Sequence, residues 1–420
     1  MKAFKKVVLK YNSVSLIFRI FIGICIGVIL ALTVPKASWI ATFGSLFVGA
    51  LKAIAPILVA VLVTSALCQG SARLDKRFGM VIFLYLITTL IASFVAVVAS
   101  FIFPQTMVLA ESVGEQTPPG GVGEVLSNLL MNIIVNPVQA VSSANYMGIL
   151  LWAVVFGLAL KKVGSDTTKN MLSDFSDAVS TGVKWIINLA PFGICGLVFD
   201  SVSSNGLNIF VDYGKIVALL VGSMLVVSLI INPIIVAICL RCNPYPLVWR
   251  CLKESGITAF FTRSSAANIP VNMELCEKLG LDKDVYSVSI PLGATINMDG
   301  AAITITIMTL AAANTVGISV DIPTALIMSF LAAVAACGAS GVAGGSLLLI
   351  PMACSLFGIS NDIAMQVVAV GFIIGVIQDS VETALNSSGD VLFAATAEYY
   401  EWRRSGRALP DFLKKGKKAD

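Results

Sequence analysis

Acidic side chains occur inside segments that are otherwise apolar enough to cross a membrane. Asp299 lies in the middle of the run PLGATINMDGAAITITIMTL, and Asp379, Glu382 and Asp390 lie in the last long apolar segment. A charge at the centre of a membrane helix costs ~2.5–3.5 kcal/mol on insertion scales. These acids are therefore expected to face the protein interior, where they are paired, hydrated or bound to cations.

The polar residues of the last apolar segment repeat with the period of an α-helix. Asp379, Glu382, Thr383, Asn386 and Asp390 fall on one helical face. Carboxylates, amides and hydroxyls gathered in this way have the oxygen chemistry that suits a hard cation, and sodium is the abundant one with a gradient. Proton coupling is the rival interpretation, because a buried carboxylate can carry a proton.

Structural explanations of the same residues remain open. Arg263 and Asp379 also fit a purely structural ion pair, and Asn297 and Asn386 also fit hydrogen bonds between helices. The glycines of GASGVAGG, at 338–345, also fit close helix packing. They do not form a phosphate loop, because no Lys-Ser/Thr pair follows them.

The composition is that of an integral membrane protein. Of its 420 residues, 57% are hydrophobic and 12% are charged, which is about half the charged fraction of an ordinary globular domain. The net charge of +4 is too small to indicate a nucleic-acid partner. The nine cysteines lie mostly in apolar runs, and Cys239 and Cys242 have no second pair and no histidine to complete a zinc site.

Six apolar runs before residue 245 are each long enough to cross ~30 Å of hydrocarbon as a helix. They are 14–35, 39–68, 78–104, 140–160, 182–202 and 215–241. The first follows Lys2, Lys5, Lys6 and Lys10 without a convincing cleavage site, so it is interpreted as a span and not as a signal peptide. Basic residues gather in alternate loops and in the C-terminal tail, which predicts an even number of spans and cytoplasmic termini.

After residue 245 the apolar segments are interrupted by polar or glycine-rich tips. Residues 246–280 contain TRSS between two short apolar halves, and residues 323–358 contain GASGVAGG. Each broken segment precedes what we expect to be an intact helix, at about 286–314 and 363–398. The expected topology places the two broken segments on opposite sides of the membrane, which indicates an inverted repeat with a binding site at the breaks.

Among function classes, a secondary transporter is favoured. The chain has no HExxH motif and no histidine, and Asp299 and Asp390 lack the flanking motifs expected of an intramembrane aspartyl protease. A channel would show one continuous pore-lining repeat in place of two inverted broken units. No ATP-binding motif is present, so the energy must come from an ion gradient.

The motifs of residues 257–390 resemble those of the dicarboxylate/amino acid:cation symporter family, which includes the glutamate transporters. They are TRSSAANIPVNM, GATINMDG, GASGVAGG and DSVETALNSSGD. The resemblance extends over about residues 14–400 and is greatest to the bacterial sodium/serine–threonine branch. It implies an all-α polytopic membrane protein, with eight transmembrane helices and two re-entrant helical hairpins, that works as an elevator.

The resemblance also implies two domains and a homotrimer in the bacterial cytoplasmic (inner) membrane. Residues 14–68 and 123–203 would form the trimerisation scaffold, with spans 1, 2, 4 and 5. Residues 78–104 and 215–400 would form the mobile transport domain. That domain would hold spans 3 and 6, the hairpins at about 246–280 and 323–358, and spans 7 and 8 at about 284–314 and 363–398.

Three sodium sites are implied by the resemblance. The first would be formed by Gly293, Asn297, Asn386 and Asp390. The second would be formed by Thr295 and the second-tip carbonyls of Ala336, Cys337 and Ala339. The third would be formed by Asp299, Asn297, Tyr85, Thr88 and Thr89.

The implied substrate contacts are Ser265, Val342, Asp379, Glu382, Thr383 and Asn386. Asp379 would take the substrate ammonium and Asn386 its carboxylate. Acid-transporting members carry arginine at the position of Glu382 and threonine at that of Ala301, so a second substrate carboxylate should be rejected. We expect sodium-coupled import of small neutral amino acids, L-serine and L-threonine first, with dicarboxylates or acidic amino acids as the alternative substrates. Glu382 would either bind the substrate hydroxyl or turn toward Arg263 and balance its charge.

Overall fold

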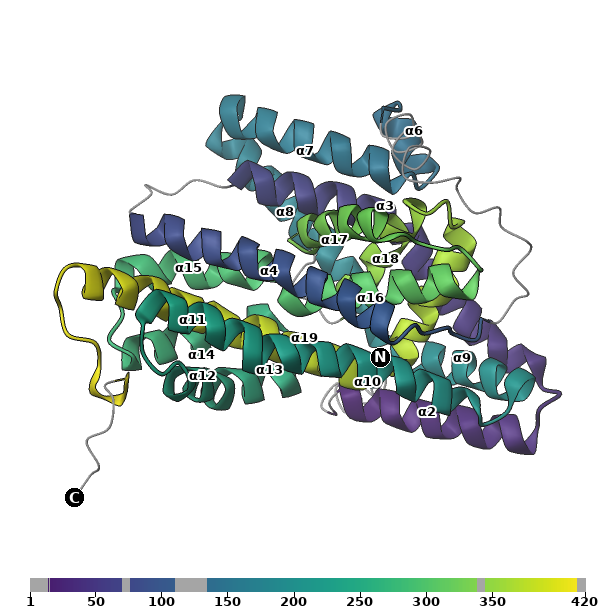
Figure 1. The fold of residues 1–420 in the computed structure, drawn as a ribbon. Helices are drawn as coiled ribbons and strands as arrows, with labels where there is room; N and C mark the ends of the chain where they lie inside the picture. Colours follow the sequence, from purple (N-terminus) through teal and green to yellow (C-terminus); the bar gives the residue numbers. More distant parts are fainter. Residues whose placement is uncertain (1–13, 15, 70–75, 110–133, 338–343, 414–420) are drawn as a thin grey trace, which may run out of the picture.

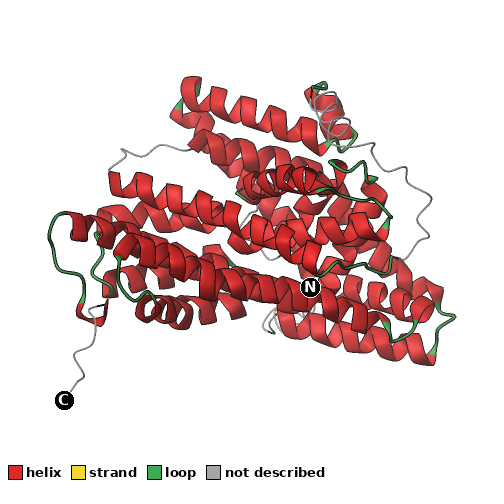
Figure 2. Ribbon diagram, in the orientation of Figure 1, coloured by secondary structure: helices red, strands yellow, loops and turns green. Residues whose placement is uncertain are grey.

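The computed structural model describes residues 14, 16–69, 76–109, 134–337 and 344–413, and the structural statements below concern those residues. Their regular elements are all helical, with no strand (Figures 1 and 2). Five helical stretches are long and apolar enough to cross a membrane, and the bent pair α8 and α9 makes a sixth if it counts as one span. An all-helical membrane protein is therefore confirmed for the described chain, whereas the count of eight spans stays a prediction.

One group of helices contains the segments expected to form the scaffold. It comprises α2 (Leu16–Thr33), η1 (Ser38–Ile40), α3 (Ala41–Gln69), α6 (Pro137–Ser142), α7 (Tyr146–Val163), α8 (Asp166–Asn188) and α9 (Ala190–Asn205). In this group α2 packs along α9, and α3 packs against α7, α8 and α9 (Figure 1). The sequence segments of the expected scaffold are therefore neighbours in space.

The second group surrounds the last long helix. It comprises α4 (Lys76–Ile102), α10 (Ile209–Val226), η2 (Val227–Ile231), α11 (Asn232–Leu240), α15 (Lys283–Ile296), α16 (Asp299–Thr315) and α19 (Asn361–Arg404). α19 is unbroken over 44 residues and packs against α4, α10, α11, α15 and α16. α19 is therefore the central helix of this group, and the other helices pack around it.

Both interrupted segments consist of two helical arms. The first has α12 (Tyr245–Cys251), η3 (Leu252–Gly256) and α13 (Ile257–Thr262), then α14 (Ser265–Lys278). The chain reverses between the arms at Arg263, whose φ of 51° lies in the left-handed region. The second has α17 (Ile322–Ala336), then η4 (Ser346–Leu349) and α18 (Ile350–Ser355). Residues 338–343 of its tip lie outside the described chain.

The prediction of an intact helix over residues 286–314 is wrong. α15 ends at Ile296 and α16 begins at Asp299, and Asn297 and Met298 between them have non-helical backbone angles. The Met298 N–H donates to Thr89 Oγ1 at 3.2 Å, so a side chain of α4 replaces the helical acceptor. Non-helical backbone at membrane depth is tolerated because such side chains satisfy it.

The apolar run 182–202 is also divided, although it was expected to be one span. α8 ends at Asn188, α9 begins at Ala190, and the two helices are bent by 52°. Pro191 stands in the first turn of α9, where its missing N–H leaves no bond unmade but its ring prevents the preceding helix from continuing. The predicted span is therefore the bent junction of two helices.

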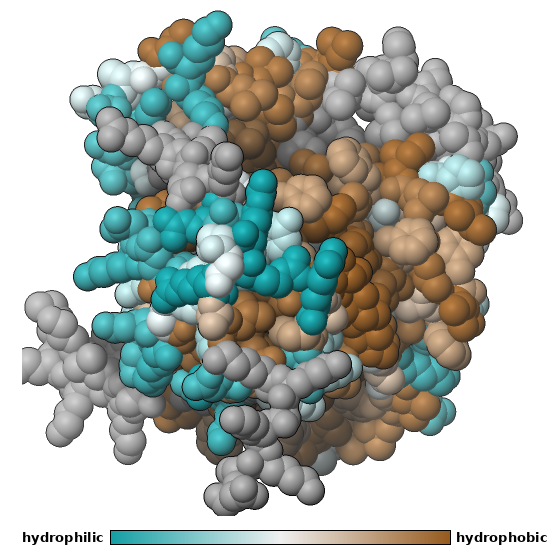
Figure 3. Space-filling model, turned by 60° about the vertical axis from the view of Figure 1, so that its left-hand side comes forward, coloured by the Kyte–Doolittle hydropathy of each residue, from teal (hydrophilic) through white to brown (hydrophobic). Residues whose placement is uncertain are grey.

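Hydrophilic residues gather at one end of the molecule. The end of α11, the start of α12 and α15 and the end of α19 lie together there, on the left of Figure 1. Figure 3 turns this end forward and shows hydrophilic side chains gathered beside a broad hydrophobic face. At this end Arg77 of α4 pairs with Asp282 at 2.9 Å.

Glycines allow α9 to approach its neighbours at backbone distance. A Cβ at Gly196 would lie 2.5 Å from the Gly44 nitrogen and 2.8 Å from the Ile40 oxygen. A Cβ at Gly27 of α2 would lie 2.6 Å from the Cys195 oxygen. These are backbone atoms that cannot rotate away, so the close packing of α2, α3 and α9 requires residues without side chains.

Replacing Gly196 with alanine should therefore destabilise the protein. We expect a cost of ~1–3 kcal/mol from overpacking, seen as a lower midpoint of thermal unfolding in detergent. Gly182→Ala in α8 is the matched control, because nothing lies within 4 Å of the added Cβ. Equal unfolding midpoints for the two variants would contradict the packing argument.

Candidate substrate and cation site

The break between α15 and α16 brings Asn297 against α19. Asn297 Nδ2 donates to the Asn386 carbonyl oxygen at 2.9 Å and to Asp390 Oδ1 at 3.0 Å. Gly293 belongs to the same group, because a Cβ there would lie 2.7 Å from Asp390 Oδ1. All four residues expected for the first cation site therefore meet. Asn297 Oδ1 is buried and has no hydrogen-bond partner in the described chain, which leaves an amide oxygen for a cation.

Asp299 lies beside this group, in the first turn of α16. Its side chain is fully buried, and Oδ1 accepts a hydrogen bond from Thr89 at 3.1 Å. Oδ2 accepts from Asn232 at 3.3 Å. Asn232, at the start of α11, was not predicted as a member of the site. Its position as a polar residue inside the apolar run 215–241 could have indicated it.

Tyr85 and Thr88, from α4, complete the surroundings of the two acids. The Tyr85 hydroxyl donates to the Asp390 carbonyl oxygen at 2.9 Å. Thr88 Oγ1 donates to the Leu84 carbonyl oxygen of its own helix at 2.8 Å. α4 therefore presents three hydroxyls, counting Thr89, to one buried region, and Tyr85 links the first expected cation site with the third.

The residues expected for the second cation site are only partly brought together. Cys337 Sγ lies 3.6 Å from the Ile296 carbonyl oxygen, so the tip after Ala336 begins beside the end of α15. Thr295 is exposed, and its hydroxyl bonds to the Leu292 carbonyl oxygen at 2.7 Å. Ala339 lies outside the described residues.

Arg263 at the first tip contacts Asp379 of α19. Arg263 Nε and Asp379 Oδ2 are 2.7 Å apart, and the two residues are 7% and 3% exposed. Asp379 Oδ1 accepts a hydrogen bond at 3.2 Å from the Gly344 N–H of the second tip. A single carboxylate therefore joins both interrupted segments to the central helix.

Glu382 does not turn toward Arg263, which was one of the two alternatives considered from the sequence. Its Oε2 accepts hydrogen bonds from Thr304 at 2.7 Å, Ser346 at 2.9 Å and Gln378 at 2.5 Å. In the described chain no bond joins Glu382 to Arg263, so charge balance by direct pairing is not seen here. Thr304, Ser346 and Gln378 were missed, although Gln378 is adjacent to the acidic face.

The remaining expected substrate contacts lie around Asp379. Asn386 Oδ1 accepts from the Gly300 N–H at 2.7 Å, and its Nδ2 contacts only the Met298 sulfur, at 3.5 Å. Thr383 Oγ1 bonds back to the Asp379 carbonyl oxygen at 2.7 Å. Ser265 is buried at the start of α14. Val342 lies outside the described residues.

A buried polar network behind the first hairpin was not anticipated. Asn268 Nδ2 donates to Ser387 Oγ at 2.8 Å, and Asn272 Nδ2 donates to the Ser387 carbonyl oxygen at 3.0 Å. Asn272 Nδ2 also lies 3.5 Å from Asp390 Oδ2. Both asparagines belong to the first-tip motif, four residues apart, but their partner could not be identified without the fold.

The charge of the site favours cations. Arg263 is the only buried basic side chain of the described chain, while Asp299, Asp379, Glu382 and Asp390 are all buried. When all are ionised, three negative charges remain uncompensated in a region away from water. No cluster of three or more His, Cys, Asp or Glu suited to a transition metal is present in the described residues. Dispersed amide, hydroxyl and carboxylate oxygens instead fit a hard monovalent cation.

Broken helices around buried acids in a multi-pass helical protein are typical of secondary transporters. The model of the sodium:dicarboxylate symporter family matches residues 16–399, and the chain belongs to this family.

Curated relatives match along nearly the whole chain. The serine/threonine transporter SstT of Bifidobacterium adolescentis is 63% identical over 412 residues, which cover 98% of this chain and 96% of that protein. Proteins of the same name from Streptococcus agalactiae and Streptococcus thermophilus are 61% and 56% identical. They cover 95% and 96% of this chain, and 98% and 100% of their own lengths.

Gly293 provides a test of the cation site. The Cβ of Gly293→Ala would lie 2.7 Å from Asp390 Oδ1 and 2.9 Å from the Tyr85 hydroxyl, so the carboxylate must shift. We expect about a tenfold or greater loss of apparent sodium affinity, measured as the rise of the melting temperature with sodium chloride against choline chloride. Gly375→Ala in α19, with nothing within 4 Å of its Cβ, should keep the sodium response. An unchanged response in Gly293→Ala would remove this group from the cation site.

Proposed function

We propose that the protein imports small neutral amino acids, L-serine and L-threonine first, together with sodium ions. The family membership and the printed names of the relatives support this assignment. The observation that carries it is the charge of the site. The one buried basic side chain of the described chain, Arg263, is already paired with Asp379.

A substrate with a second carboxylate therefore has no free positive partner. Glu382 adds a negative charge on the same helical face, where its Oε2 is held by three donors. Bringing an aspartate or glutamate side chain against it would place two like charges in a region of low dielectric. A hydroxyl can instead donate a hydrogen bond to Glu382, and a site built to pair a hydroxyl discriminates against substrates that lack it.

The backbone of the amino acid also has suitable partners. Asn386 Nδ2 contacts only a thioether sulfur, a weak acceptor, so it is available to the substrate carboxylate. Asp379 offers its Oδ1 to the ammonium group, because Arg263 is paired with Oδ2 and, in the described chain, Oδ1 accepts only the Gly344 N–H. Ser265, Thr383 and Val342 would line the remaining wall of the substrate site.

Sodium is assigned to the three oxygen-rich groups. Gly293, Asn297, Asn386 and Asp390 would form one site, and Asp299, Asn297, Tyr85, Thr88 and Thr89 another. Thr295 with the carbonyls of Ala336, Cys337 and Ala339 would form the third. The uncompensated negative charge of the buried acids supports these assignments, because cations that enter with the substrate would neutralise it.

We also propose that the protein assembles as a homotrimer and moves as an elevator, as its resemblance to the family implies. Residues 14–68 and 123–203 act as the scaffold of a homotrimer in the bacterial inner membrane, with both termini in the cytoplasm. Residues 78–104 and 215–400 move as an elevator and carry the site across. The packing of α3 against α7, α8 and α9, and of α4, α10, α11, α15 and α16 against α19, supports this division.

The competing function is sodium- or proton-coupled transport of dicarboxylates or acidic amino acids, and the family description names sodium and dicarboxylates among these. Uptake of labelled serine and aspartate into proteoliposomes distinguishes the two. We expect serine to accumulate only with an inward sodium gradient and to be displaced by unlabelled threonine. Avid aspartate uptake, or serine uptake that follows a proton gradient and ignores sodium, would refute the proposal.

Replacing Glu382 with glutamine tests the basis of specificity. If Glu382 accepts the substrate hydroxyl, serine affinity should fall by about tenfold, the loss expected for a hydrogen bond to a charged group, while alanine affinity changes little. Competition against labelled serine measures both. Ser380→Ala is the control, because that hydroxyl bonds only to the Val376 carbonyl of its own helix. An equal loss for serine and alanine would instead assign Glu382 a purely structural role.

A further inference from the structure

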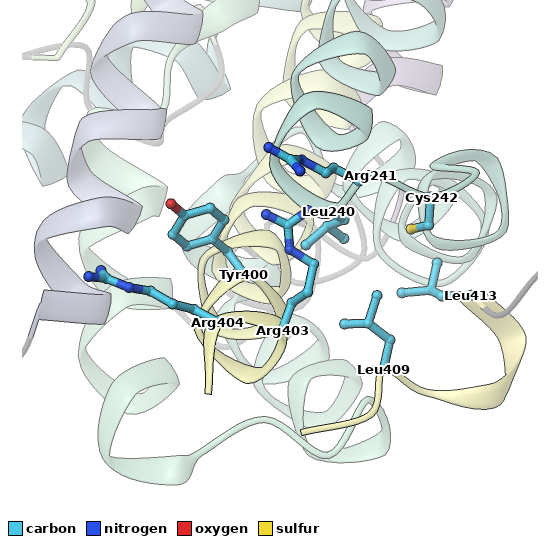
Figure 4. A pocket seen from close by; sticks show the side chains of 8 residues that line it. All are labelled: Leu240, Arg241, Cys242, Tyr400, Arg403, Arg404, Leu409 and Leu413. Carbon is cyan, nitrogen blue, oxygen red and sulfur yellow. The ribbon is translucent and has the colours of Figure 1, made fainter. Parts of the chain in front are cut away.

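Three arginines line one pocket at the hydrophilic end of the molecule, apart from the transport site. Arg241 follows the last residue of α11, and Arg403 and Arg404 end α19. The pocket has a volume of about 810 Å³ and is also lined by Leu240, Cys242, Tyr400, Leu409 and Leu413. In Figure 4 the guanidinium groups of Arg241 and Arg403 face the same space, with Leu409 and Leu413 across from them.

The arginines have no anionic partner within the described chain. No carboxylate there forms an ion pair with any of the three. Arg403 Nη1 is shielded from solvent and lacks a hydrogen-bond partner, and its guanidinium lies 5.6 Å from the centre of the Tyr400 ring. A buried guanidinium nitrogen without an acceptor indicates that an anion is missing from the pocket.

The segment that forms the wall opposite the arginines is held in position by contacts within the protein. The guanidinium of Arg407 lies 3.4 Å from the centre of the Trp402 ring, and that of Arg250 lies 4.9 Å from the Phe412 ring. Leu413 is 2% exposed. The segment after α19 is therefore held in place, and the pocket does not need to form around its ligand.

The pocket is continuous with the apolar surface of α11. Ile238 and Ile234 are 70% and 50% exposed and lie about one and two turns before Arg241. The candidate spans Ile209–Leu240 and Asn361–Arg404 both end at this pocket, and basic residues at the ends of such spans are expected at the level of the lipid headgroups. An acyl chain along α11 would therefore bring its headgroup phosphate to the arginines.

We propose that this pocket binds the phosphate group of an anionic phospholipid. Guanidinium groups match phosphate oxygens in a bidentate manner, and basic pockets between membrane helices bind anionic headgroups. The leucines and the exposed isoleucines accommodate the acyl chains. The ligand joins α11, α19 and the segment at 405–413, and this role does not depend on which amino acid is transported.

Lipid binding to the purified full-length protein in detergent tests the proposal. The probes are a short-chain phosphatidylglycerol, the phosphatidylcholine of the same chains, and inorganic phosphate, with bound lipid counted by native mass spectrometry. We expect phosphatidylglycerol to bind at least tenfold more tightly than phosphatidylcholine. Inorganic phosphate that competes fully at millimolar concentration would keep the phosphate site but assign it to a soluble ester. Equal affinity for the two lipids without phosphate competition would overturn the proposal.

Substitutions inside and outside the pocket test whether phosphatidylglycerol binds at the arginines. R241Q/R403Q should weaken phosphatidylglycerol binding by about 25-fold, since each basic residue near the surface contributes about fivefold, or ~1 kcal/mol. K253Q/K283Q removes the same charge from exposed positions at the same end and should change affinity less than threefold. R241K/R403K keeps the charge and controls for folding, and its affinity for phosphatidylglycerol is expected to lie between those of R241Q/R403Q and K253Q/K283Q. Equal losses in R241Q/R403Q and K253Q/K283Q would reduce the effect to general surface charge and refute the pocket.

Discussion

The cost of placing charge in a low-dielectric interior governs the structure. Five acids and one arginine are buried in the described part of this apolar chain; four of the acids and the arginine surround the candidate site, and each must find compensation nearby. The compensation comes from broken backbone, amides and hydroxyls on different segments, which converge on α19. The breaks at Asn297 and Arg263 are consequences of this requirement, because an unbroken helix has no spare backbone groups to offer.

Hydrogen bonds divide the acids into two pairs with different surroundings. Asp299 and Asp390 contact amides and hydroxyls, which leaves oxygen atoms facing inward without a cationic side chain. Asp379 and Glu382 lie one turn apart, and the hairpin tips reach both, through Arg263, Gly344 and Ser346. In the proposed transport cycle, ion binding and tip closure would therefore act on adjacent turns of one helix, which offers a direct physical route for coupling them.

The sequence contains much of this arrangement, but not all of it. The polar face from Asp379 to Asp390 is visible from helical period alone, and membrane insertion cost places it inside. The break at Asn297 could not be predicted in the same way. No glycine or proline occupies the break itself, at Asn297 and Met298, and the break is stabilised by Thr89, Asn386 and Asp390 from other helices. Asn268 and Asn272 were visible as polar residues, yet their shared partner, Ser387, depends on how α14 packs on α19.

The unbroken length of α19 has a mechanical consequence. Its 44 residues extend for about 66 Å, roughly twice the thickness of the hydrocarbon layer. Asp379 and Arg403 belong to one continuous helix and are separated by about 36 Å along it, so a displacement of this helix along the membrane normal carries both residues. In the elevator movement that we propose, such a displacement would move the arginines at the end of α19 relative to the lipid headgroups. The free energy of the movement would then depend on bilayer thickness and surface charge, and therefore on lipid composition.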